Sequence, residues 1–434
     1  MVGPARAPGG LAMGIGNTPP TAGVEAERYR PAPRGSRKGI GICLSGGGYR
    51  ATLFHMGALR RLNELGVLAH RDLRTISSVS GGSITSAFLA LAFKWPVPGV
   101  LAPTDWEARF SRPLRDFTRH NIRDGALLKS LLPGRAAVTE LAKRYDAALR
   151  RLAGATGSVK LGSVPSTPSF SFCATDLAFG VNWESAALEI GDYQAGYIPT
   201  PDGWTLGLAV AASSCFPPVF QPLRVPFELG VWARGKARSA SEDKWKAAMQ
   251  DLRLTDGGDY DNMGTEPVWK DHSFVLVSDA GGLFDFQADK NLLWRVQRYQ
   301  AVQELQTRAL RKRWLISSFE QGIMDGTYWS TGSARSSYDE RDSAGYSKEL
   351  AKDVIAEIRT DLDAFSDAEA AVLENHGYLL ADKAVLQHCP EVATNPSAPL
   401  SVPVDEWLPP RKPEDEVRRA LADSHRRKVP FGRR

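Results

Sequence analysis

Cysteine is scarce in this sequence, and its distribution excludes several kinds of site. The chain of 434 residues contains four cysteines, none of them in a CxxC pair: Cys43, Cys173, Cys215 and Cys389. This spacing argues against a zinc site or a redox motif. Cys43 and Cys173 lie in apolar runs typical of strands, where a buried free thiol is expected. We therefore expect unpaired thiols and a reducing compartment.

Long hydrophobic runs are also lacking. The longest apolar stretch covers residues 87–93, whereas a membrane-spanning helix needs about 20 apolar residues. Residues 1–37 are rich in glycine, proline and alanine and lack the apolar centre of a signal peptide. We therefore predict a disordered N-terminal segment and a cytoplasmic protein that meets membranes only from their surface.

Most of the chain has little excess charge of either sign. The net charge is +5, and residues 411–434 alone contain nine Lys or Arg and four Asp or Glu. The rest is therefore close to neutral. Residues 390–434 form a proline-rich, basic C-terminal segment, and its last part, the basic tail at residues 411–434, can touch anionic lipid or nucleic acid. We expect this tail to be solvated and disordered instead, and we expect no nucleic-acid partner.

Short apolar runs alternate with longer segments of helical periodicity. The runs at residues 39–44, 73–79, 252–255 and 274–278 predict buried strands. Helices are predicted for residues 49–65, 81–93, 206–213, 290–319 and 361–375. A mostly parallel central sheet flanked by helices accounts for this alternation, so the sequence predicts an α/β fold.

Three segments depart from this pattern or add to it. Residues 233–250 are polar without a clear period and are predicted to be an insertion. Residues 326–347 are rich in Gly and Ser and are predicted to form a loop or lid. The helix at residues 290–319 carries an apolar stripe that includes Tyr299 and Val302, and an excess of Arg and Lys. It either covers the sheet, which we expect, or rests on an anionic membrane.

The first motif with chemical meaning is Ser-Gly-Gly-Gly-Tyr-Arg at residues 45–50, between a predicted strand and a predicted helix. Consecutive glycines allow a sharp turn that points N–H groups outward, and the helix N-terminus adds positive partial charge. Such a loop binds a phosphate or the oxyanion of a tetrahedral intermediate. It matches neither the dinucleotide fingerprint in its usual context nor the Gly-Lys-Ser/Thr of a Walker loop.

A second turn, Ser-Val-Ser-Gly-Gly-Ser at residues 78–83, again joins a strand to a helix. It is similar to the nucleophile elbow G-x-S-x-G, in which the serine sits on a strained turn. Ser80 takes the nucleophile position, and Ser78 replaces the first glycine with another small residue. The N–H of Gly81 would point at the same oxyanion as the glycine cluster. The alternative is a turn that is built from small residues for packing and has no catalytic role.

The third motif is Asp256-Gly257-Gly258, which follows the strand predicted at residues 252–255. An aspartate at a strand end beside two glycines is well placed for an active site at a sheet edge. A plain turn is the alternative. Asp259 and Asp261 follow closely, but their spacing does not match an EF-hand.

The order of these three motifs resembles the patatin-like phospholipases, and the first also resembles the oxyanion loop of the related cytosolic phospholipases. Residues 172–176 (FCATD) and 211–218 (AASSCFPP) add to the resemblance. It spans roughly residues 38–285, with weaker support over 361–381. It implies a three-layer patatin-like fold, with a catalytic domain over residues 38–389.

The resemblance also implies a catalytic dyad without histidine. Asp256 would be the general base for Ser80, the nucleophile, and would then activate water. Fatty-acyl esters of phospholipids or other acyl lipids would be hydrolysed through an acyl-enzyme. No metal and no cofactor would be needed.

The same resemblance assigns the groups that would surround the reacting ester. The amides of Gly46, Gly47, Gly48 and Gly81 would form the oxyanion hole. Arg50 matches the arginine of the Gly-Gly-Gly-x-Arg motif and would contact a lipid phosphate, or else form a salt bridge in the first turn of its helix.

Three other interpretations stay open. The first is a regulated phospholipase effector or toxin, for example in antiviral defence, that is inactive until it is triggered. The second is an α/β-hydrolase with a Ser-His-Asp triad, for which His376 and His388 lie late enough in the chain. However, His376 is predicted to cap a helix end before Gly377, and His55 is predicted to be packed. The third is a non-catalytic lipid binder, against which the presence of both Ser80 and Asp256 argues.

Overall fold

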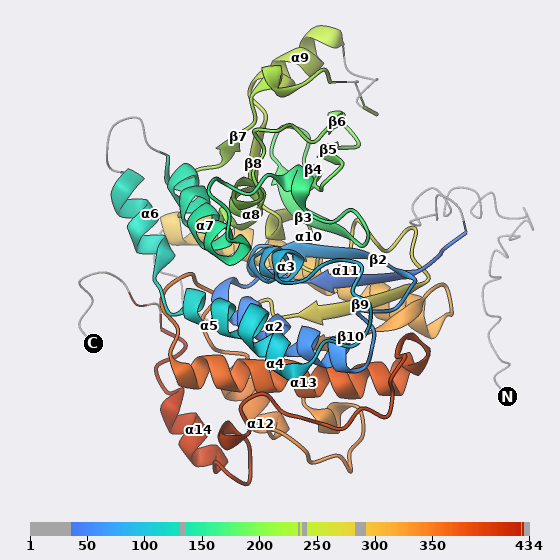
Figure 1. Cartoon of the computed structure of the whole chain (residues 1–434). Helices are drawn as coiled ribbons and strands as arrows, with labels where there is room; N and C mark the ends of the chain where they lie inside the picture. Colours follow the sequence, from blue (N-terminus) through green and yellow to red (C-terminus); the bar gives the residue numbers. More distant parts are fainter. Residues whose placement is uncertain are drawn as a thin grey trace, which may run out of the picture.

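The computed structural model describes residues 36–130, 136–232, 235–236, 241–282, 292–426 and 428 (Figure 1). Its strands are β1 (Ile40–Leu44), β2 (Leu73–Val79), β3 (Ser169–Asp176), β4 (Val181–Ser185), β5 (Glu189–Asp192), β6 (Gly196–Pro199), β7 (Leu223–Arg224), β8 (Arg253–Asp256), β9 (Phe274–Asp279) and β10 (Asp325–Ser330). They form a 10-stranded sheet in the order β10-β9-β1-β2-β3-β4-β5-β6, with β8 on β3 and β7 on β8. Strands β10 to β3 of this order are parallel, as predicted.

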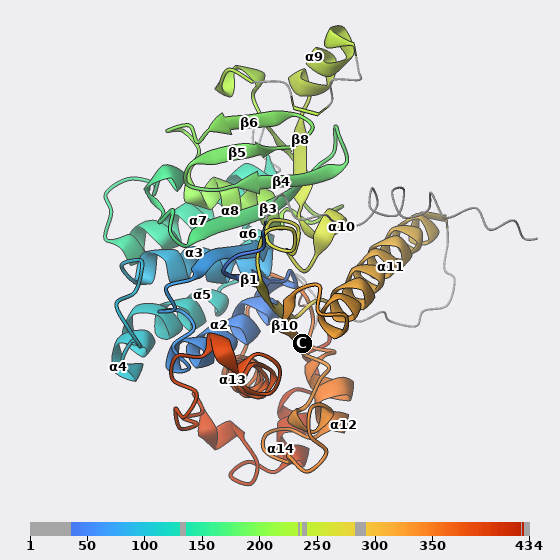
Figure 2. The ribbon, with the colours of Figure 1, turned by 90° about the vertical axis from the view of Figure 1, so that its right-hand side faces the viewer.

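Helices cover both faces of the sheet. They are α2 (Gly48–Glu64), α3 (Gly81–Ala92), α4 (Pro103–Trp106), α5 (Arg112–Thr118), α6 (Ile122–Ser130), α7 (Ala137–Ala153), α8 (Leu206–Ser214), α9 (Glu242–Gln250), α10 (Gly258–Asp261), α11 (Leu292–Glu320), α12 (Lys348–Leu350), α13 (Asp367–His388) and α14 (Glu414–Ala420). Helices α2, α3 and α13 lie on one face, and α10 and α11 lie on the other (Figure 2). The predicted three-layer α/β fold is therefore confirmed.

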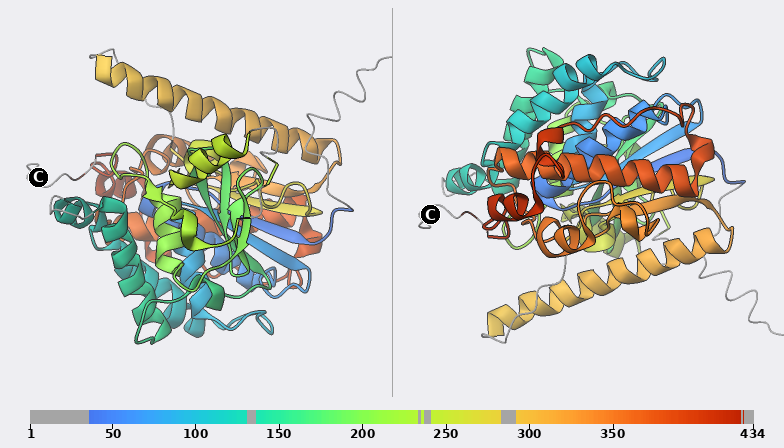
Figure 3. Two further views of the ribbon diagram at one scale, coloured as in Figure 1. Left: turned by 90° about the horizontal axis from the view of Figure 1, so that it is seen from above. Right: turned by 90° about the horizontal axis from the view of Figure 1, so that it is seen from below.

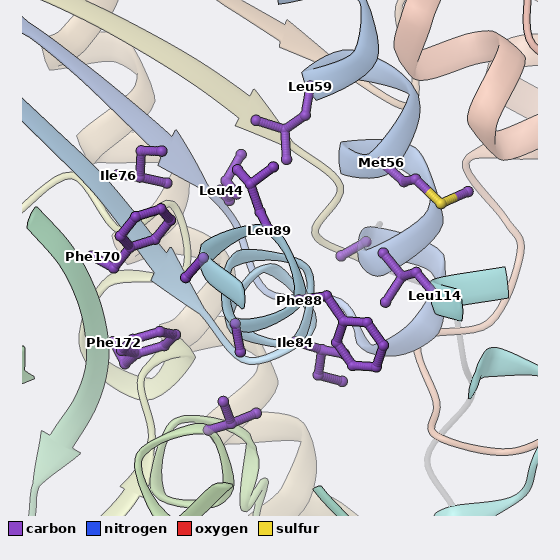
Figure 4. Close-up of a cluster of buried hydrophobic side chains, with 14 of the residues drawn as sticks. Leu44, Met56, Leu59, Ile76, Ile84, Phe88, Leu89, Leu114, Phe170 and Phe172 are labelled. Atoms are coloured by element: carbon purple, nitrogen blue, oxygen red, sulfur yellow. The ribbon is translucent and has the colours of Figure 1, made fainter. Parts of the chain in front are cut away.

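The two faces of the sheet bury different cores because successive side chains of a strand point to opposite sides. Ile42 and Leu44 of β1 belong to the large core beneath α2 and α3. Figure 4 shows part of this core, in which Phe88 of α3 lies with other apolar side chains of helices and strands. Cys43 of β1 points to the smaller core, which also contains Leu315 of α11.

Helix α13 corrects the prediction of a helix that ends before Gly377. Ser366 is its N-cap, whose side chain accepts a hydrogen bond from the N–H of Glu369, and the helix runs from Asp367 past Gly377 to His388. A methyl group at Gly377 would collide with the carbonyl of Phe54 in α2. The glycine therefore permits close helix packing and does not end the helix.

Two further predictions are corrected. The predicted loop at residues 326–347 begins as β10, an edge strand of the sheet. Residues 411–426 of the predicted disordered tail pack on the body, with Val417 and Leu421 buried. Few apolar residues among many charges suffice to anchor this segment. Residues 427 and 429–434 lie outside the described part.

The other domain predictions are only partly open to description. The predicted disordered segment falls almost wholly on residues 1–35, outside the described residues. In the predicted insertion, α9 forms its second half, whereas residues 233–234 and 237–240 are not described. Among the helices that the structure describes, none combines the length and the hydropathy needed to cross a membrane.

Candidate active site

The strand register brings the predicted nucleophile and base together. Val79, the last residue of β2, lies opposite Cys173 of β3. On the same edge of β3, one residue further along, Ala174 lies opposite Asp256, the last residue of β8. Since β8 is antiparallel to β3, the carboxyl ends of β2 and β8 point at each other. Ser80, which follows Val79, therefore faces Asp256.

Ser80 has the strained backbone of a nucleophile elbow. Its φ of 51° and ψ of −114° make it the one non-glycine residue with positive φ in the described part of the chain. Methyl groups at Gly81 and Gly82 would collide with the carbonyls of Gly48 and Leu44. The strand-to-helix turn thus leaves no room for larger residues, and the strain holds the serine at the helix start.

A buried serine network behind the elbow holds this strained turn. The N–H of Ser80 donates to Oγ of Ser213 (2.9 Å), which donates to the carbonyl of Cys173 (2.6 Å). Oγ of Ser83 lies 2.8 Å from the same hydroxyl. Sequence reasoning noted the segment around Ser213 only as part of a family resemblance. A polar residue inside the otherwise apolar helix α8 was the available signal.

The glycine loop after β1 lies beside the nucleophile. A Cβ at Gly46 would lie 3.2 Å from Cβ of Ser80. The N–H of Gly46 donates to the carbonyl of Asn262 (2.9 Å), so the prediction that this amide binds the oxyanion is wrong. The N–H groups of Gly47, Gly48 and Gly81 have no acceptor within the described ranges. These three amides stay available as oxyanion donors.

Ser45 and His55 anchor the glycine loop from behind. Oγ of Ser45 accepts the N–H of Ala280 (2.7 Å), and the carbonyl of Ser45 lies 2.9 Å from Nε2 of His55. Nδ1 of His55 is 2.8 Å from Oγ of Ser278. Burial lowers the pKa of His55 to about 4, so the ring is neutral. The prediction that His55 is packed is confirmed by these contacts.

Arg50 does not occupy either of its predicted roles. The side chain is 2% exposed, and its guanidinium donates to the carbonyls of Ala280 (2.7 Å), Ala356 (2.6 Å) and Ile358 (2.7 Å). Burial lowers its pKa to about 9. Because backbone carbonyls accept hydrogen bonds from the guanidinium and the side chain is buried, Arg50 fixes these backbone segments to one another inside the protein. It is directed neither at a lipid phosphate nor at a carboxylate in its own helix.

The carboxyl of Asp256 is buried, and its pKa is shifted into the neutral range. Burial raises the pKa of its carboxyl to about 7, although hydrogen bonds from the Gly258 N–H and the Ser80 hydroxyl oppose the increase. The N–H of Gly258 lies 2.8 Å from Oδ1. The charges of Asp259 and Glu304 raise the pKa further. Desolvation therefore makes this carboxylate a stronger proton acceptor than an exposed one.

Asn262 is a site residue that sequence reasoning missed. Its side chain lies between three glycines: a methyl group at Gly46 would collide with its Oδ1, a Cβ at Gly258 would lie 2.8 Å from Oδ1, and a Cβ at Gly281 would lie 2.5 Å from Nδ2. The carboxamide thus separates the glycine loop, the turn after Asp256 and the loop after β9. Its place four residues after two glycines was a weak signal.

The late histidines both lie on α13, where the ring of His388 packs against the ring of Tyr338. His376 is buried on α13, where Nε2 lies 3.0 Å from the carbonyl of Thr331, and burial lowers its pKa to about 4. The rings of Phe54 and Tyr346 pack against it. These contacts leave no position for a triad with Ser80. In the described residues, no group of His, Cys, Asp or Glu is arranged to hold a metal ion.

Comparisons with known proteins identify the family to which this sequence is similar. The model of the patatin-like phospholipase family matches residues 42–269. No curated protein matches the chain in sequence. Among solved structures, the chain is similar to human GIVD cytosolic phospholipase A2, with 15% identity, 56% of this chain and 45% of that one covered, and a TM-score of 0.40. It is also similar to VipD from Legionella pneumophila, with 14% identity, 80% and 66% covered, and a TM-score of 0.31. The chain thus spans less than half the length of the human protein.

Proposed function

This chain belongs to the patatin-like phospholipase family, and on that premise we propose that it hydrolyses fatty-acyl ester bonds of phospholipids or similar acyl lipids. Ser80 is the nucleophile and Asp256 is the general base. The observation that carries the proposal is the end-to-end approach of β2 and β8, which brings a strained serine to a buried carboxylate of raised pKa.

The reaction runs in two halves. Oγ of Ser80 attacks the ester carbonyl while Asp256 takes its proton, and the N–H groups of Gly47, Gly48 and Gly81 hold the developing oxyanion. The carboxyl then returns the proton to the leaving alcohol, a lysolipid, and an acyl-enzyme remains. Asp256 next takes a proton from water, which attacks the acyl-enzyme, and the carboxyl returns this proton to Oγ of Ser80 as the C–O bond breaks and the fatty acid leaves.

The pKa of Asp256 fits both halves of this cycle. A general base works best when its pKa lies near the working pH, because it is then ionised yet still basic enough to accept a proton. With a pKa of about 7, the carboxyl can hold the serine proton and return it. Activity is expected to rise with pH through about 7, as the carboxyl ionises.

The test is release of fatty acid from mixed phospholipid vesicles. Ser80→Ala and Asp256→Ala are each expected to lower the rate about 1,000-fold or more. Asp259→Asn is the matched control: it removes a neighbouring carboxylate, keeps activity and shifts the pH profile to lower pH, because its charge raises the pKa of Asp256. Labelling by a fluorophosphonate probe should require Ser80. Activity that survives Asp256→Ala and is lost in His376→Ala would replace the dyad by a triad.

A further inference from the structure

Helix α11 is a rod of 29 residues that runs along one side of the molecule, with its N-terminal end beyond the body (Figure 3). Residues of a helix that are three or four apart share a face. By this spacing, Glu304, Arg308, Arg311 and Leu315 form an inner face. The residues on the opposite side, which we call the outer face, are Arg295, Tyr299, Val302, Gln306, Leu310 and Arg313.

The inner face fastens the helix to the body. The guanidinium of Arg308 lies 2.9 Å from Oδ2 of Asp279, at the end of β9. Arg311 pairs with Glu266 at 3.3 Å, and Leu315 is buried in the smaller core. Because these contacts occupy the middle and the C-terminal half of α11, the helix is held in place without its outer face.

The outer face exposes apolar side chains in a row. Tyr299, Val302 and Leu310 are 66%, 39% and 59% exposed. Eleven large apolar side chains are exposed in the described part, and three of them lie on this one face of one helix. Arg295 and Arg313, both exposed, stand at the two ends of the row. An apolar row between arginines suits a surface that is apolar inside and anionic at its boundary.

Charge decides between a membrane and a second copy of the chain. Helix α11 contains six Arg or Lys and two acidic residues, Glu304 on the inner face and Glu320 at its C-terminal end, so its net charge is +4. A second copy would bring an equally basic helix against this one, which is unfavourable. An anionic lipid surface attracts it.

We propose that the outer face of α11 docks the protein on anionic lipid membranes. The purpose of this contact rests on the proposed lipid hydrolysis. The inner face of the same helix borders the catalytic edge, since Arg308 also donates to the carbonyls of Gly281 and Gly282, and Gly281 contacts Asn262. Docking through the outer face therefore brings the catalytic edge close to its lipid.

The experiment measures vesicle binding in the Ser80→Ala background, so that the lipid stays intact. Cosedimentation compares vesicles of phosphatidylcholine with vesicles that also contain phosphatidylglycerol. The Val302→Ser, Leu310→Ser double variant removes apolar side chains from the outer face. Leu400→Ser is the matched control, because this leucine is similarly exposed on the C-terminal segment that packs beside α13.

We expect binding to anionic vesicles that weakens with salt and falls about tenfold or more in the double variant, with no change in the Leu400→Ser control. With Ser80 restored, the double variant should lose vesicle hydrolysis but keep hydrolysis of a soluble short-chain ester. Equal binding by the double variant and the control would overturn the docking proposal, as would absence of binding. The docking proposal would also be overturned if the double variant changed the self-association of the protein and left vesicle binding unchanged. Binding without any esterase activity would instead contradict the proposed function and leave docking intact.

Discussion

The two faces of the central sheet are held in different ways. On the face of α2, α3 and α13, the core is large and mainly apolar, although it includes a buried ion pair between Arg61 and Asp382, and packing is so close that a methyl group at Gly57 of α2 would collide with the carbonyl of Glu374 in α13. On the face of α10 and α11, seven buried apolar residues form the core. Charged contacts supply much of the remainder, among them Arg308 with Asp279 and Arg311 with the ring of Tyr260.

The proposed dyad joins these two faces. Ser80 begins α3 on the apolar face, whereas Asp256 is followed by α10 on the polar face. Close apolar packing tolerates no change of volume, so it suits the strained nucleophile. Ion pairs of partly exposed arginines are more tolerant, and they hold the helix that we propose to meet the membrane. One side of the sheet thus contributes most of the stability, and the other side carries the helix that we propose to contact lipid.

The largest loss of stability is expected at the crossing of α2 and α13. Gly57→Ala places a methyl group into the carbonyl of Glu374, and two buried helix backbones must move apart to admit it. We expect a loss of more than about 3 kcal/mol in unfolding free energy, or failure to fold. Urea unfolding measures it. Gly99→Ala is the control, since a methyl group there meets no atom within 4 Å; equal effects of both changes would contradict the comparison.

The second expected effect is a gain in the free energy of unfolding, caused by a substitution of Asp256. Asp256 has a folded-state pKa of about 7 against an ordinary value of 3.8, so its ionisation destabilises the folded chain as pH rises between these values. Asp256→Asn removes that cost and is expected to stabilise the fold by a few kcal/mol at pH 8, at about 1.36 kcal/mol per pKa unit. Well below pH 3.8, at about pH 2.5, the carboxyl is protonated in both the folded and the unfolded chain, so the gain should vanish. Thermal unfolding at the two pH values decides; a gain independent of pH would contradict the raised pKa.

On the face of α10 and α11, the expected loss of stability is smaller than at the crossing of α2 and α13. Arg308→Met leaves the buried carboxylate of Asp279 with hydrogen bonds from Tyr328 and Gly281 only. We expect a loss of about 2 kcal/mol, below the range for fully buried pairs because Arg308 is partly exposed. The charge of Arg308 lowers the pKa of Asp279 to about 2 despite burial, so the loss should shrink in strong acid. Arg313→Met on the outer face is the control, with an expected change under about 0.5 kcal/mol.

Local patterns predicted the apolar side of this comparison well. The strands, the elbow at Ser80 and the glycine loop all follow from short motifs, because each needs only neighbouring residues. Gly377 misled the prediction, since a glycine that ends a helix and one that admits a second helix look alike in sequence. The difference is the distant partner Phe54, which only the fold reveals.

Contacts between distant segments account for the other errors. Arg50 matches a family motif, yet its guanidinium meets carbonyls more than 200 residues away. The amide of Gly46 was assigned to the oxyanion because nothing near it in sequence indicates its acceptor, Asn262. The approach of β8 to β2 was equally hidden, because an antiparallel strand at this edge has no local signature.

The smallest expected effect concerns Asn262, at the seam between the two faces. Its carboxamide lies between the glycine loop and the turn after Asp256, while its backbone carbonyl, which any residue supplies, accepts the N–H of Gly46. Asn262→Ala keeps that hydrogen bond and removes the spacer, so the amides of Gly47 and Gly48 are held less firmly. We expect about tenfold slower acylation, a cost of about 1.4 kcal/mol to the transition state, with KM and unfolding temperature little changed.

Fluorophosphonate labelling of Ser80 reads the acylation rate directly, and the pH profile provides a second reading. If Asn262 acts only by shape, Asn262→Asp restores the spacer and brings a carboxylate beside Gly258, so the rate should recover at high pH while the pKa of Asp256 rises. A structural role unrelated to catalysis would lower the unfolding temperature in Asn262→Ala and leave the labelling rate of the folded fraction unaltered. In that case, Asn262 would have no part in positioning Asp256, and only the other contacts on the face of α10 and α11 would do so.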